Sequence, residues 1–194
     1  MPALMERLAR LMALVGGLVL TALVVLVGVS VAGRGGSTFA HWDAFQELAP
    51  GLSAGLLATG IGPVPGDFEL VEAGIAFAVF AFLPICQLRG GHATVDVFTS
   101  YLPHRANAAL IAFWEVLLAL LILLITWRLF AGMLGKLGNG ETTFILQFPI
   151  WWAYAASFVA ALGASVVAIW CAATRVFALF GGPQLLPDGG GADH

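Results

Sequence analysis

One carboxylate lies inside a long apolar run, residues 108–127, where its type and position could support chemistry. Glu115 is about eight residues into this run, roughly 12 Å along a helix axis. An exposed carboxylate in hydrocarbon costs about 2.5–3.5 kcal/mol, so Glu115 must face protein, be protonated, or both. It could act as a proton or cation relay. It could also be a polar clasp to another helix or subunit, with Ser165 at a similar depth as a hydrogen-bond donor. The clasp is favoured because the other runs carry no carboxylate or histidine at a neighbouring depth.

Two further acidic residues, Glu69 and Glu72, begin the apolar run 69–88. A pair of carboxylates about one helical turn apart could bind a cation. Acidic residues in a first turn more often favour the positive end of the helix dipole, and we favour that interpretation.

His92 and Asp96 are four residues apart in the connection that follows, so on a helix they would share a face. A metal site would need at least one more ligand nearby, so a helix cap or a partner of Arg89 is the favoured role of Asp96. The spacing of apolar residues predicts a short amphipathic helix here, pressed against the membrane and ended by Pro103.

Cysteine and histidine positions argue against redox and haem chemistry. Cys86 and Cys171 stand alone, without the Cys-x-x-Cys pair of a membrane disulfide oxidoreductase. All four histidines fall in connections or the tail, whereas a haem-bearing helical cytochrome needs histidines on facing helices. We therefore expect no cofactor.

The elements that carry these residues are four apolar runs, 11–33, 69–88, 108–127 and 150–174. Each has the roughly 20 residues that cross about 30 Å of hydrocarbon, and spans of this length must be helices to pair their backbone groups. The chain is 60% hydrophobic and only 10% charged, with a net charge of -3 and no basic block. This predicts an all-α integral membrane protein, one domain over residues 1–180, whose immediate environment is the lipid bilayer. Nucleic acid is excluded as a partner, and no length remains for a soluble catalytic domain, so we expect no enzyme.

Lysine and arginine counts beside the spans predict that both termini are cytoplasmic. With that orientation the inner side holds Arg7, Arg10, Arg89, Arg105 and Arg175, and the outer side holds Arg34, Arg128 and Lys136. The first run exceeds the roughly 7–15 apolar residues of a signal peptide, so we expect an uncleaved helix.

The long outer connection, 34–68, has two open interpretations. Phe39, Trp42, Phe45 and Leu48 recur every three residues, which predicts a short helix on the membrane surface, capped by Ser37 or Thr38. A structureless extension is the alternative, and the Gly/Pro-rich stretch from Pro50 to Gly66 should be irregular. The tail, 181–194, is predicted to be disordered.

A stripe of small residues follows the fourth run at intervals of four, which permits close approach of another helix. We predict a packing face, in this chain or against another one, at Ala156, Ala160, Ala164 and Ala168.

Around residues 89–103 the sequence resembles the small membrane subunit, of the DctQ type, of tripartite ATP-independent periplasmic (TRAP) transporters. The resemblance rests on Glu69 and Glu72 at the start of the second span and on a Gly-x-His-x-x-x-Asp-like pattern, here Gly90 or Gly91, His92 and Asp96, followed by Leu102-Pro103. It rests further on a Thr-rich turn before Pro149 and Trp151, and it covers roughly residues 11–175. The first outer connection is longer than this family leads us to expect.

The resemblance implies an accessory subunit that packs against a large permease subunit in the bacterial inner membrane. That assembly would take up an organic acid delivered by a periplasmic binding protein, using a sodium gradient. The spans also lack the broken helices and midplane polar site of a complete carrier. The alternative is a self-sufficient oligomeric transporter that couples transport to protons through Glu115.

Overall fold

The computed structural model describes residues 2–90, 104–183 and 186, and these residues form helices joined by turns. Four helices are long and apolar enough to cross a membrane: α1 (Pro2–Ala40), α4 (Asp67–Leu88), α6 (His104–Asn139) and α7 (Trp151–Leu179). The prediction of an all-helical, four-span membrane protein is therefore confirmed for the described residues. "Inner" below means the end at which α1 begins, the predicted cytoplasmic side, and "outer" means the opposite end.

Helix α1 continues beyond the predicted span and ends only at Ala40. Ser37 and Thr38 lie inside it, and the Thr38 hydroxyl donates to the Arg34 carbonyl at 2.9 Å, a bond within the helix. The prediction that one of them caps a separate helix is therefore wrong. The glycines at 35 and 36 do not end α1, although each lowers helix propensity.

Two short helices follow at the outer end of α1. Helix α2 (Asp43–Leu48) begins after Trp42, which makes no side-chain cap, and α3 (Pro50–Ala58) has Pro50 in its first turn, where proline is tolerated. The part of the Gly/Pro-rich stretch that includes Pro50 is thus helical. The Ser53 hydroxyl donates to the Ala40 carbonyl at 2.8 Å and ties α3 back to the end of α1.

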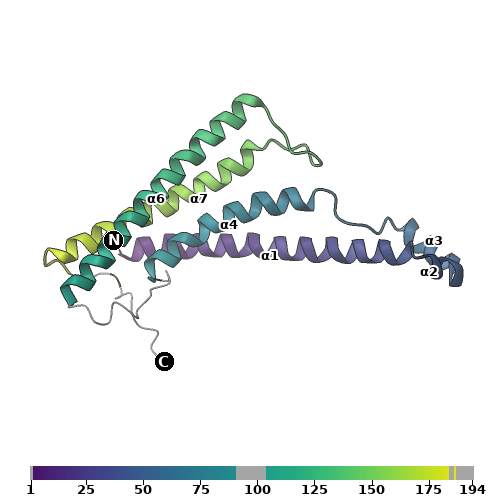
Figure 1. Ribbon diagram of the computed structural model, residues 1–194, viewed down its shortest axis with the longest axis horizontal. Coiled ribbons are helices and arrows are strands. Elements are labelled where there is room, and N and C mark those ends of the chain that lie inside the picture. Colours follow the sequence, from purple (N-terminus) through teal and green to yellow (C-terminus); the bar gives the residue numbers. More distant parts are fainter. Residues whose placement is uncertain (1, 91–103, 184–185, 187–194) are drawn as a thin grey trace.

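The four long helices form two antiparallel pairs, α1 with α4 and α6 with α7, which spread apart toward the outer end (Figure 1). Close contacts fix the α1–α4 register: a Cβ on Gly16 would lie 2.9 Å from the Ala81 Cβ, and Leu23 lies against Gly74. Helix α7 packs against α4 as well as α6, so the order across the molecule is α1, α4, α7, α6.

Helix α7 is the most buried of the four spans, because it has neighbours on two sides. Its small residues Ala160, Ala164 and Ala168 are at most 4% exposed, and Ala164 and Ala168 pack in a cluster with Ala119 and Ile122 of α6. These three members of the predicted stripe contact the chain's own helices, whereas Ala156 is exposed.

Candidate intramembrane polar site

Glu115 is bonded to another helix of the same chain. Its carboxylate accepts a hydrogen bond of 3.0 Å from the side-chain amide of Gln87 on α4, and the two residues are only 7% and 2% exposed. Next to Glu115 on α6, Val116 packs with Leu83 of α4 against the apolar cluster that includes Ala168 and Ala172 of α7. Residues of three helices therefore meet here. We call Gln87 and Glu115 the inner clasp.

Ser165 does not take part in this clasp. Its hydroxyl shares a hydrogen bond of 2.9 Å with the Thr126 hydroxyl, which also lies 2.8 Å from the Ile122 carbonyl. In place of the suggested bond between Ser165 and Glu115, the structure has two separate contacts: Glu115 with Gln87, and Ser165 with Thr126. The depth estimate failed because it set the inner ends of the two spans level, whereas Ser165 of α7 lies opposite Thr126 of α6, eleven residues beyond Glu115.

The depth of Glu115 follows from its partner. Helix α4 is about 33 Å long at 1.5 Å per residue, close to the roughly 30 Å hydrocarbon thickness, so its ends mark the two membrane surfaces. Gln87 is the penultimate residue of α4, which places Glu115 near the inner surface. A carboxylate near the headgroups and bonded to an amide is easier to accommodate than one at the midplane.

At the outer end, Glu69 binds the loop between α6 and α7. Its two carboxylate oxygens accept the backbone N–H groups of Ile145 at 2.6 Å and Leu146 at 2.9 Å. Leu146 also lies directly against Gly66, where φ is +75° and an added Cβ would meet its side chain at 2.4 Å. Glu72 is exposed and does not join this contact. Because Glu69 is engaged by two amides, the geometry supports a structural role for it more than a cation site.

The loop itself is a short, ordered turn. Thr142 and Pro149 form an antiparallel bridge, and the Thr143 N–H donates to the Phe148 carbonyl at 2.9 Å. Pro149 directly precedes Ile150, the N-cap of α7. Gln147 has φ of 56°, a left-handed conformation that is uncommon outside glycine, and its side-chain amide donates to the Phe144 carbonyl at 2.8 Å.

Glu141 begins this loop and pairs with Lys136 at the end of α6. The hydrogen bond from Lys136, with a second one from Asn139 at 3.1 Å, holds the pKa of the Glu141 carboxyl below its usual range. This pair joins the last turn of α6 to the turn that leads into α7.

A second outer contact joins α1 to the start of α4. The fully buried Ser30 hydroxyl donates to the Asp67 carboxylate and accepts the Val64 N–H at 3.2 Å. Arg34 adds an ion pair with Asp67 at 4.0 Å. The α1–α4 pair is thus bonded at the level where α4 begins.

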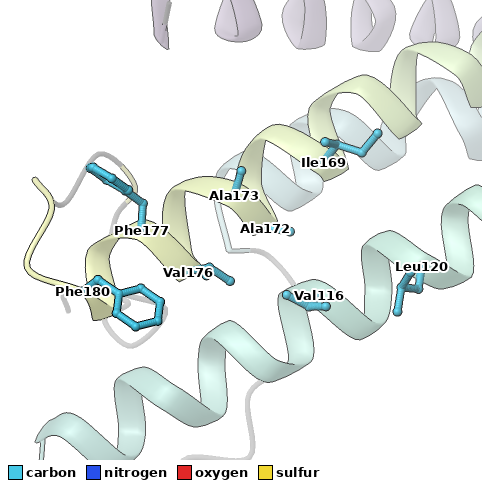
Figure 2. A pocket seen from close by; sticks show the side chains of 8 residues that line it. All are labelled: Val116, Leu120, Ile169, Ala172, Ala173, Val176, Phe177 and Phe180. Carbon is cyan, nitrogen blue, oxygen red and sulfur yellow. The ribbon is translucent and has the colours of Figure 1, made fainter.

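The inner halves of α6 and α7 form an open apolar groove. Figure 2 shows Val116 of α6 opposite Ala172 and Val176 of α7, with Phe177 and Phe180 at the end of the groove. All eight lining residues are apolar, so the groove offers no side chain for acid, base or metal chemistry and suits an apolar occupant.

Three residues of the predicted motif, His92, Asp96 and Pro103, and the short helix predicted around them lie outside the described residues. So does most of the predicted tail. Within the described ranges, no three His, Cys, Asp or Glu side chains gather closely enough to hold a metal ion.

Several polar residues of the site were not singled out from the sequence, namely Gln87, Thr126, Ser30, Asp67 and the Lys136–Glu141 pair. The sequence did contain an indication for Gln87 and Thr126. Gln87 carries a strongly polar amide and Thr126 a hydroxyl in otherwise apolar helices, and polar side chains in spans tend to face protein.

The comparison with protein families agrees with this architecture. The family model described as "Tripartite ATP-independent periplasmic transporters, DctQ component" matches residues 55–179, which include α4, α6 and α7. The match covers more than half of the chain, and the chain therefore belongs to the DctQ family of TRAP transporter components. No curated protein and no solved structure gives a significant match. Helices α1 and α2 lie outside the matched region.

Proposed function

We propose that this chain is the small accessory subunit of a TRAP transporter, which packs against the large permease subunit in the bacterial inner membrane with both termini in the cytoplasm. The complex takes up an organic acid with a sodium gradient, after a periplasmic protein delivers the substrate. The DctQ match is the observation that carries this proposal.

The polar contacts support a scaffold more than a carrier. The inner clasp uses Glu115 to join α4 to α6, and Glu69 joins α4 to the α6–α7 loop. Both acidic residues are therefore occupied in holding helices together. The described part of the chain provides no cluster of polar groups near the midplane that could bind an anionic substrate.

The alternative, a proton-coupled transporter that acts through Glu115, is less well supported. A relay carboxylate must exchange protons with both sides of the membrane, and Glu115 lies near the inner surface, buried and bonded to Gln87. If the alternative held, Glu115→Gln would abolish transport by vesicles that contain this chain alone.

Co-purification tests the proposal directly. A tagged copy of this chain, expressed with the large permease subunit of the same transporter and solubilised in mild detergent, should retain that subunit through size-exclusion chromatography. An unrelated four-span membrane protein with the same tag is the control. Recovery of the tagged chain without the large subunit would overturn the proposal.

A further inference from the structure

Arg128 is an exposed cation on the side of α6 that faces away from the rest of the chain. Glu115, Ala119, Ile122 and Thr126 form the buried stripe of α6. Arg128 is two residues beyond Thr126, about 200° around the helix axis at 3.6 residues per turn. Its side chain is exposed, and α6 lies at the edge of the helix layer, so none of the other long helices covers this face.

The depth of Arg128 follows from the inner clasp. Glu115 lies near the inner surface, and Arg128 is about 20 Å farther along α6 at 1.5 Å per residue. About 10 Å of the roughly 30 Å hydrocarbon layer therefore remains above it, and any tilt of α6 increases that depth. Arg128 thus lies deeper than the outer side, to which the count of basic residues along the sequence assigned it. The outer surface is reached near Lys136, which pairs with Glu141.

Arg128 has no acidic partner within the structure described. Arg10 pairs with Glu6, Arg34 with Asp67 and Lys136 with Glu141, and Arg128 belongs to none of these ion pairs. An unpaired arginine that faces lipid inside the hydrocarbon layer is unfavourable, and reaching toward the headgroups relieves only part of the cost. An acidic group on a neighbouring protein would remove this cost.

We propose that the face of α6 around Arg128 is an interface with a helix of the large permease subunit that carries a carboxylate at this depth. This inference rests on the proposed function. It adds which surface of the chain contacts the large permease subunit and which charged groups meet there. Leu121, Leu124 and Ile125 lie on the same face and are 43–57% exposed. They provide apolar packing around the guanidinium, and they would exclude water from the ion pair, which strengthens it.

Charge substitutions at this position test the inference in the co-expressed complex. Breaking a buried charge pair costs about 2–5 kcal/mol, which is roughly 30-fold or more in an association constant. Arg128→Glu should therefore lower retention of the large subunit by at least about 30-fold, and Arg128→Lys should retain most of it. The matched control is Gly135→Glu, two turns outward on the same face, where an added Cβ meets nothing within 4 Å. It should stay within about twofold of wild type, because exposed charges contribute little.

The yield and size-exclusion profile of each variant expressed alone are measured in parallel. Unchanged profiles for Arg128→Glu alone, together with its loss of the large subunit, support the interface. Equal retention by wild type and Arg128→Glu would overturn the interface while the proposed function stands. A defect of Arg128→Glu alone that accounts for the lost retention would also overturn it and assign Arg128 to the lipid headgroups. Failure of the wild-type chain to retain the large subunit would contradict the proposed function itself.

Discussion

The side-chain amide of Gln87 donates a hydrogen bond of 3.0 Å to the Glu115 carboxylate and so joins α4 to α6. These helices belong to different antiparallel pairs, and α7 lies between them over most of their length. The outer counterpart is the bond from the Ile145 N–H to Glu69, which joins the α6–α7 loop to α4. The two helix pairs are thus connected by a polar contact near each end of α4. Away from the inner contact the helices themselves diverge, and at the outer end it is the α6–α7 loop that reaches back to α4 (Figure 1).

The inner clasp should behave as a coupled pair. Gln87→Leu or Glu115→Leu alone leaves one buried polar side chain without its partner, which costs about 1–3 kcal/mol. The double variant removes both polar groups, so its destabilisation should be smaller than the sum of the two single effects. Thermal unfolding of the purified protein in detergent measures all four corners of this cycle. Strictly additive effects would show that the two side chains are not coupled.

Glu69 should control the order of the α6–α7 loop. Glu69→Ala removes the acceptor of the Ile145 and Leu146 N–H groups, so the exchange of these two amides with deuterium should accelerate. Glu72→Ala, on the next turn and exposed, is the control and should leave their exchange unchanged. Similar protection in both variants would mean that the loop is held by its own turn and not by Glu69.

The small residues of α7 should matter only where they face other helices. Ala164→Leu places a large side chain where the native residue is 1% exposed, and such overpacking costs about 1–3 kcal/mol. Ala156→Leu, in the same stripe but exposed, should change the free energy of unfolding by less than about 0.5 kcal/mol. Thermal unfolding in detergent compares the two. Equal destabilisation would contradict the packing of α7 described above.

The Lys136–Glu141 pair should make the α6–α7 turn sensitive to acid. Its contacts lower the pKa of the Glu141 carboxyl, so they stabilise the fold above the ordinary carboxyl pKa of about 4.3. That stabilisation is lost as the pH falls through the lowered folded-state value. The difference in Tm between wild type and Glu141→Gln should therefore be present at neutral pH and disappear in strong acid. A difference that grew as the pH fell would reverse the sign of this linkage.

The four spans could be predicted because hydrophobic length is a local property that lipid strictly enforces. The residues at which the helices end could not be predicted, because tertiary contacts decide them. Helix α1 passes through Gly35 and Gly36, while Ser30, Asp67 and Arg34 bond it to α4 just before that point. The sequence shows the two glycines, but it does not show that α4 is bonded to α1 just before them.

The partners inside the membrane were beyond prediction for the same reason. Glu115 stood out as a costly residue, and its carboxylate accepts a hydrogen bond from Gln87; its role as a clasp stays a prediction. Its partner could not be identified because the register between α4 and α6 depends on the packing of α7 against both helices. Ser165 matched Glu115 in depth only while the inner ends of the two spans were taken as level, whereas Ser165 lies opposite Thr126.

The most direct test of the central claim is solute uptake by reconstituted vesicles. Vesicles that contain this chain, the large permease subunit and the periplasmic binding protein should accumulate the organic acid when a sodium gradient is imposed. Vesicles that contain this chain alone should accumulate no more than empty vesicles. Accumulation by the chain alone, abolished by Glu115→Gln, would contradict the account and identify the chain as a carrier in its own right.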